Sequence, residues 1–162
     1  MPQISLNSPV GAITVFAFED QIVALDWGFV EKIESTPVLE EAQKQLNAYF
    51  AGRLHSFDLP LAPDGTDFQK TVWQAMGKIP MGKTATYKEL ATMAGSPKAF
   101  QSVGKACGLN PIPILIPCHR VLATGDKPGG YSGHGGLATK RALLKIEGVD
   151  LPLPSDQSAF DF

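Results

Sequence analysis

The chain has 162 residues and a mass of 17.3 kDa, the size of one domain or of two small domains packed together. Hydrophobic residues make up 44% and charged residues 19%, which supports a folded core and excludes wholesale disorder. The net charge of −2 excludes a uniformly basic surface, but the charge is unevenly distributed: residues 1–66 carry −6, residues 67–148 carry +7 and residues 149–162 carry −3. This division predicts two modules, the second of which meets an anionic partner, with nucleic acid as the leading candidate.

Two cysteines, Cys107 and Cys118, are too few for a disulfide framework. We expect reduced thiols in a cytosolic protein, or in a nuclear one if the source is eukaryotic. The first residues show neither the basic nor the apolar region of a secretory signal. No apolar run approaches the roughly 20 residues that span a bilayer, so we expect no membrane partner.

The first module begins with a β-rich region. Residues 5–9 contain turn-forming side chains, whereas residues 11–18 and 21–27 are rich in β-branched and aromatic side chains. Glu19 and Asp20 separate these two runs and are typical of a turn. The pattern predicts a small antiparallel sheet.

A helix follows the sheet. Thr36 and Pro37 are typical of an N-cap and a first helical position, and apolar side chains recur beyond them at helical spacing. Residues 56–61 are compatible with another short strand. The Pro-, Asp- and Gly-containing residues 60–65 coincide with the change of charge and are predicted to be a linker. We therefore place an α/β module at residues 1–63.

The second module, residues 64–150, is predicted to be mainly helical. Thr66 and Gln69 have the spacing of a capping box, and apolar residues follow on one face. Thr86 and Glu89 form a second predicted capping box, which opens a short helix. Both helices are therefore expected to begin at a threonine.

A third helix is expected to begin at Ser96 and Pro97 and to end at Gly108. Gly95 lies between this helix and the preceding one. Two short helices joined by a glycine-containing turn on a basic module are typical of a helix-turn-helix, although the same geometry also occurs as plain packing. Residues 151–162 are expected to be a flexible tail.

The segment Asn-Pro-Ile-Pro-Ile-Leu-Ile-Pro-Cys-His-Arg-Val, residues 110–121, carries the predicted chemistry. Its three prolines enforce a non-helical backbone that presents Cys118 beside His119. An imidazole can accept the thiol proton and a carboxylate can orient the imidazole, a role for which Glu147 is the candidate. From these residues alone, Cys118 could equally be a small buried hydrophobic residue with a polar neighbour.

Residues 116–121 resemble the active-site signature of the O6-alkylguanine-DNA alkyltransferases, also called methylated-DNA–protein-cysteine methyltransferases. The resemblance is close over residues 66–148, and the N-terminal module matches in its strand-then-helix outline. Other segments match in family order: residues 68–73, 82–91, 96–99, 103–104, 110–111, 130–133 and 140–148.

This resemblance implies an N-terminal α/β module of ribonuclease H-like outline, followed by a mainly α module with a helix-turn-helix. It implies single-turnover transfer of an alkyl group from O6-alkylguanine, and possibly O4-alkylthymine, in double-stranded DNA after base flipping. The protein would be a monomer that contacts the minor groove and is consumed by the reaction. No cofactor is implied, and the spacing of the Cys and His residues matches no compact zinc pattern.

The resemblance also implies catalytic roles for individual residues. Cys118 accepts the alkyl group, His119 acts as base through a bound water, and Glu147 orients His119. Asn110 holds the turn beneath the active-site segment. Tyr87 donates to the guanine ring and helps to rotate its nucleotide, although at the start of a helix it could simply be a packing residue.

Further residues are implied to surround the flipped base. Val121 and Cys118 offer backbone carbonyls to the exocyclic amine, and Ser132 faces the O6 edge. Tyr131 and Cys107 border the alkyl pocket. The loop that begins at Tyr131 has about two more residues than the compact family version, and His134 in this loop is expected to be solvated.

The expected DNA contacts depart from the family pattern at two positions. Gln101 stands where the family usually has an arginine, and Phe100 stands where it has a small residue. Either could fill the gap left by the flipped base, and Phe100 could also be a core residue. For Arg120, the alternative is internal support of the active-site segment. The expected contacts are Thr86, Lys98, Ala99, Phe100, Gln101, Ser102, Gly104, Lys105 and Arg120.

Two alternatives to an active alkyltransferase stay open at this point. One is a non-catalytic protein that recognises the alkyl lesion and recruits other repair factors. The presence of Cys118 argues against this alternative, but the missing arginine keeps it open. The other is a thiol hydrolase that uses the Cys-His pair, which would turn over repeatedly. An alkyltransferase would stop after one event per molecule.

Overall fold

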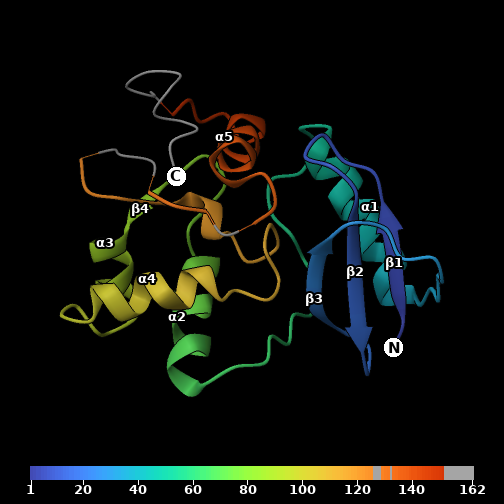
Figure 1. Ribbon diagram of the computed structural model, residues 1–162, viewed down its shortest axis with the longest axis horizontal. Helices are drawn as coiled ribbons and strands as arrows, with labels where there is room; N and C mark the ends of the chain where they lie inside the picture. The colour runs from blue at the N-terminus through green and yellow to red at the C-terminus, as the bar shows by residue number, and fades with distance from the viewer. Residues whose placement is uncertain (126–128, 132, 152–162) are drawn as a thin grey trace.

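The computed structural model describes residues 1–125, 129–131 and 133–151, which form two modules lying side by side (Figure 1). A sheet with one covering helix forms the first module, and helices form most of the second. Within these residues, no helix is long and apolar enough to cross a membrane.

The first module is built on a three-stranded antiparallel sheet in the order β1-β2-β3. Glu19 and Asp20 both have positive φ, 49° and 63°, as a tight hairpin turn requires, and the predicted turn is confirmed. The turn-forming residues 5–9 begin inside a strand, because Ser5 and Leu6 pair with β2. The strands are β1 (Gln3–Leu6), β2 (Ile13–Phe18) and β3 (Gln21–Trp27).

Helix α1 (Pro37–Phe50) packs against the sheet with four buried residues at helical spacing: Leu39, Ala42, Leu46 and Tyr49. It starts where predicted, but the Thr36 side chain makes no capping hydrogen bond. The expected strand at residues 56–61 does not form in the structure. Within this stretch, Leu61 makes an isolated bridge with Ile22. Main-chain bonds from one bridge do not suffice for a strand.

The second module contains α2 (Asp67–Gly77), α3 (Tyr87–Met93), α4 (Phe100–Gly108) and α5 (Gly136–Ile146). Both capping boxes are confirmed, since the Gln69 and Glu89 amides each donate to the preceding threonine hydroxyl at 3.1 Å. The predicted start of the third helix is wrong. The Ala99 amide donates to the Ser96 carbonyl at 2.9 Å and closes a turn, so α4 begins only at Phe100.

A short parallel pair of strands brings the start of α3 beside the Cys-His-Arg segment. Strand β4 (Ala85–Thr86) pairs with β5 (Val121–Leu122), which directly follows the 3-10 turn η1 (Cys118–Arg120). Tyr87 is the first residue of α3. This pairing therefore fixes the position of Tyr87 relative to Cys118.

The two modules share one continuous apolar core. At their junction the Leu25 amide of β3 donates to the Pro111 carbonyl at 3.0 Å, so the sheet edge holds the active-site segment directly. At the other end, Leu151 is buried against Leu122 and Leu144, and the predicted tail thus starts too early by at least this residue. The rest of that tail lies outside the described residues.

Candidate active site

Asn110 braces the proline-containing segment that precedes Cys118. Its Oδ1 accepts the Ile112 amide at 2.9 Å and its Nδ2 donates to the Ile116 carbonyl at 2.8 Å. Ile114, at the tip between these two contacts, has a φ of 74°, a conformation that non-glycine residues adopt only when their surroundings impose it. The Asn110 side chain therefore bridges both arms of a tight turn whose exit leads into Cys118.

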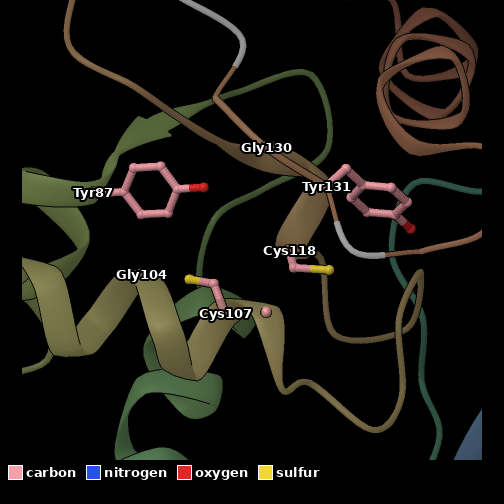
Figure 2. A pocket seen from close by; sticks show the side chains of 7 residues that line it. Tyr87, Gly104, Cys107, Cys118, Gly130 and Tyr131 are labelled. Atoms are coloured by element: carbon pink, nitrogen blue, oxygen red, sulfur yellow. The ribbon is translucent and has the colours of Figure 1, made fainter. Parts of the chain in front are cut away.

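Cys118 lies at the edge of a cavity of about 200 Å³. Figure 2 shows Tyr87 and Tyr131 on opposite sides of this space, with Gly104 and Cys107 of α4 below it. Gly133 permits the position of Tyr131, because a Cβ there would lie 2.4 Å from the tyrosine ring. We call this space the lesion pocket, and it is lined by Tyr87, Gly104, Cys107, Gly108, Cys118, Gly130 and Tyr131.

The two thiols at the lesion pocket are both protonated at neutral pH. Burial raises the pKa of Cys118, although a hydrogen bond with Asn110 and the charge of Lys140 act in the opposite direction. Burial also raises the pKa of Cys107, to about 12. The Cys107 thiol donates to the Met76 sulfur at 3.6 Å. A thiolate at Cys118 therefore requires a base that removes its proton at the moment of reaction.

Behind Cys118, a single carboxylate organises the polar groups. Glu147 Oε2 lies 2.6 Å from His119 Nε2, and the Arg120 guanidinium donates to both carboxylate oxygens, at 2.8 and 3.1 Å. Burial acts to raise the pKa of Glu147, but hydrogen bonds from His119, Arg120 and Tyr49 outweigh it and lower the pKa to about 2. Glu147 is thus ionised. We call Tyr49, His119, Arg120 and Glu147 the rear network.

The ionised Glu147 decides the tautomer of His119. A carboxylate only accepts hydrogen bonds, so His119 Nε2 carries the proton and Nδ1 holds the lone pair. The ring is fully buried, and burial lowers its pKa in spite of the neighbouring carboxylate. Nδ1 has no hydrogen-bond partner among the described residues. Neutral His119 can therefore accept a proton at Nδ1.

Arg120 does not lie on the DNA-facing surface, and its expected phosphate contact is wrong. Its side chain is 7% exposed, and besides Glu147 it donates to the Ile79 carbonyl at 2.6 Å. A guanidinium whose donors are used internally has no free face for a phosphate. The alternative, internal support of the active-site segment, is the correct one.

Lys140 of α5 is a buried cation that the sequence analysis did not assign. It is fully buried, and its Nζ donates to the carbonyls of Val121 at 2.6 Å and Gly130 at 3.0 Å. Burial lowers its pKa to about 8. The signal was available, since Lys140 lies three positions after Leu137 and three before Leu143 on the apolar face of α5.

Two residues of the first module also reach this region. Tyr49 Oη donates to Glu147 Oε2 at 2.5 Å, and the Trp27 ring meets the Tyr131 ring edge-on, with centroids 6.4 Å apart. Tyr49 and Glu147 are 98 positions apart in the chain. No motif or periodicity of the sequence links residues at such a separation, so neither contact was predicted.

Helix α4 presents an exposed face that contains four of the nine expected DNA contacts, Phe100, Gln101, Ser102 and Lys105. Phe100 is 40% exposed, with the Lys88 ammonium 5.7 Å from its ring centroid, so the reading of Phe100 as a core residue is wrong. Thr86, Ala99 and Gly104 are half-buried, and Ser132 lies outside the described residues. His134 is exposed. The exposed members of the set are Lys98, Phe100, Gln101, Ser102 and Lys105.

Comparisons with known proteins agree over almost the whole chain. The profile described as "6-O-methylguanine DNA methyltransferase, ribonuclease-like domain" matches residues 3–63, and that described as "6-O-methylguanine DNA methyltransferase, DNA binding domain" matches residues 67–149.

Named relatives and a solved structure cover similar lengths. The methylated-DNA–protein-cysteine methyltransferase of Methanosarcina barkeri is 47% identical over 150 residues, covering 88% of this chain and 94% of the relative. The constitutive enzyme of that name from Bacillus subtilis is 40% identical, with 88% and 93% coverage. A crystal structure of Mycobacterium tuberculosis OGT in complex with DNA has a TM-score of 0.83, 39% identity, and coverage of 99% of this chain and 100% of that one.

Proposed function

Because the chain belongs to the 6-O-methylguanine DNA methyltransferase family, we propose that it transfers the alkyl group of O6-alkylguanine in DNA to the sulfur of Cys118, once per molecule. Its function is direct-reversal DNA repair, and its enzyme class is the methylated-DNA–protein-cysteine methyltransferase. The observation that carries the assignment of Cys118 is its place at the edge of the lesion pocket, one residue before an imidazole whose proton-accepting nitrogen has no partner in the described part of the chain.

The proposed step is a single displacement. Cys118 Sγ attacks the carbon bound to O6, the S–C bond forms as the C–O6 bond breaks, and the electron pair remains on guanine. The thiol proton passes through a water to His119 Nδ1, while Glu147 holds Nε2–H. The departing guanine takes the hydroxyl proton of Tyr87, which lines the same pocket. The proton on His119 then returns to this phenolate through solvent, so charge and protons balance. The thioether product has no easy route back to a thiolate, and the protein is consumed.

Tyr87 is the proposed donor to the guanine ring. Its side chain lines the lesion pocket, and burial raises its pKa, partly offset by a hydrogen bond with the Gly130 backbone. A phenol with a raised pKa keeps its proton available for donation. In the same proposal, the Val121 and Cys118 carbonyls receive the exocyclic amine. Lys140 already uses one lone pair of the Val121 oxygen and thereby holds this carbonyl in place.

We further propose that α3 and α4 act as a helix-turn-helix whose second helix enters the minor groove of double-stranded DNA. Phe100 and Gln101 stand at the exposed start of α4, where one of them would fill the gap left by the flipped base. Lys98 and Lys105 would contact phosphates, which gives affinity without sequence preference. Small residues at Ser102 and Gly104 allow close approach to the groove.

The module division that we propose is residues 1–63, a ribonuclease H-like supporting module, and residues 64–150, the DNA-binding and alkyl-acceptor module. The matched ranges of the two family profiles support this boundary. We propose that the protein acts as a monomer. A reducing compartment such as the cytosol would keep the Cys118 thiol free for the reaction.

The test is an intact-mass measurement after mixing the protein with a duplex that contains one O6-methylguanine. The wild type should gain the mass of one methyl group, never more than one per molecule, and Cys118→Ala should gain none. Repeated turnover would instead indicate a hydrolase. Binding of the lesion without any gain in mass would contradict the proposed transfer and favour recognition alone.

A further inference from the structure

We propose that Tyr49, which belongs to the first module, is a positioning residue for the alkyl transfer: its hydroxyl holds the Glu147 carboxylate in the orientation that His119 requires. This inference rests on the proposed function, because it assigns Tyr49 a part in the same reaction. The first module would then contribute to the rate of the chemistry and not only to the stability of the fold.

The ring of Tyr49 is held firmly by its own module. The residue is 1% exposed, and its ring meets those of Phe50 and Phe57 at centroid distances of 5.3 and 5.1 Å. Helix α1 supplies Tyr49 on the same buried face as Leu46. The ring therefore cannot turn freely, and the direction of its O–H bond is set by the packing of α1.

The hydroxyl crosses the junction between the modules and ends on the oxygen that also holds His119. Glu147 Oε2 accepts from Tyr49 Oη at 2.5 Å, from His119 Nε2 at 2.6 Å and from Arg120 Nη2 at 3.1 Å. Oε1 accepts only from Arg120 Nε among the described residues. Tyr49 is thus a neutral donor from the first module, and it shares its acceptor atom with the imidazole.

Two consequences follow from this shared oxygen. First, Tyr49 and Arg120 approach Glu147 from different modules and so fix the plane of the carboxylate, which fixes the ring of His119. Second, a donated hydrogen bond withdraws negative charge from Oε2, so the carboxylate stabilises a protonated His119 less strongly. The Tyr49 hydroxyl thereby lowers the pKa of His119. The imidazole then stays neutral, and able to accept a proton at Nδ1, down to a lower pH than it would without this hydrogen bond.

Other charged groups near His119 do not depend on Tyr49. Arg120 and Lys140 lower the pKa of His119 through their positive charges, and both are held by contacts of their own in the second module. His55 lines a separate cavity beside Tyr49 and Glu147. The variant Tyr49→Phe therefore changes one donor and leaves these groups in place.

The experiment compares wild type, Tyr49→Phe and Phe57→Leu in single-turnover alkyl transfer with excess O6-methylguanine duplex, across a range of pH. We expect Tyr49→Phe to lower the maximal rate by about tenfold, to leave the DNA concentration for half-maximal rate unchanged, and to move the acid limb of the rate profile to higher pH. Phe57→Leu loosens the ring cluster around Tyr49 but keeps its hydroxyl, so transfer should slow far less than in Tyr49→Phe and the acid limb of the rate profile should stay near its wild-type position.

An NMR titration of the His119 ring nitrogens gives a second readout that needs no transfer, with His55→Gln and His134→Gln used for assignment. The pKa of His119 should rise in Tyr49→Phe. If this variant does not fold, the wild-type Tyr49 hydroxyl proton should be seen to shift as His119 titrates. A wild type that transfers no methyl group would contradict the proposed function. An unchanged rate, pH profile and His119 titration in Tyr49→Phe would overturn the role of Tyr49 alone.

Discussion

The two sides of Cys118 differ in how completely their polar groups are paired. In the rear network, the Glu147 carboxylate accepts four hydrogen bonds from three side chains. By contrast, the hydroxyl of Tyr131, whose side chain lines the lesion pocket, and Nδ1 of His119 are buried with no partner within the described residues. These two atoms are buried as the Glu147 side chain is, so the difference does not come from access to solvent.

The contrast indicates which part of the site is complete before DNA binds. An unpaired buried polar group costs about 1–3 kcal/mol, and such groups are retained mainly where a substrate or a water completes them. The Glu147 carboxylate already has its partners and can hold His119 in one orientation from the outset. Nδ1 of His119, unpaired within the described residues, is the atom that accepts the Cys118 proton in the proposed transfer.

Among the substitutions that test this contrast, Glu147→Gln should have the largest effect on stability and on the rate of transfer. The substitution leaves Arg120 as an uncompensated buried cation, for which we expect a loss of about 3–5 kcal/mol in the free energy of unfolding, measured with urea. It also removes the carboxylate that fixes the tautomer of His119, so single-turnover transfer should slow by about 100-fold or more. A stable variant with full transfer rate would show that the rear network is dispensable.

The free energy of unfolding should also depend on pH differently in wild type and in Glu147→Gln. The folded-state pKa of Glu147 is about 2, below its ordinary value of 4.5, so its ionisation stabilises the fold above pH 4.5. This contribution is lost as the pH falls from 4.5 toward 2. The free energy of unfolding of wild type should therefore fall more steeply in this range than that of Glu147→Gln. Parallel curves would contradict the low pKa.

Phe100→Ala and Gln101→Ala test whether either side chain fills the gap that the flipped base would leave in the DNA. Because both side chains are exposed on α4, their removal should change the free energy of unfolding by less than about 0.5 kcal/mol. Loss of the residue that fills the gap should slow transfer from the duplex by about tenfold. Transfer from free O6-alkylguanine base should be unaffected. If neither variant slows repair of the duplex, neither residue replaces the flipped base.

Tyr131→Phe should have the smallest effect. Its change in the free energy of unfolding should not share the sign of the loss expected from substitutions in the rear network. Its hydroxyl is buried and unpaired within the described residues, so removing it should leave the free energy of unfolding unchanged or raise it by up to about 1 kcal/mol. Tyr49→Phe, which deletes a paired hydroxyl, should lower it under the same urea titration. A clear loss of stability in Tyr131→Phe would mean that this hydroxyl is paired in solution.

The sequence alone determined the features that depend on near neighbours. The hairpin turn at Glu19 and Asp20 and the capping boxes at Thr66 and Thr86 were predicted correctly, because each pairs residues three positions apart. The family, and with it the enzymatic activity, was likewise readable from motif order. Contacts between residues a few positions apart depend on the local backbone conformation, so the spacing of residue types along the chain is enough to predict them.

Only the tertiary structure decided which polar groups are buried together. Arg120 was expected to contact DNA and bonds instead to Glu147, and no motif predicted the contact of Tyr49. Lys140 lies in a segment that matches the family, but its buried contacts with main-chain carbonyls became apparent only in the structure. Their partners are 10 to 98 positions away. A charge on a buried face must find whatever partner the packing brings within reach, because water is no longer there to solvate it. That partner depends on the whole fold, and no stretch of sequence records it.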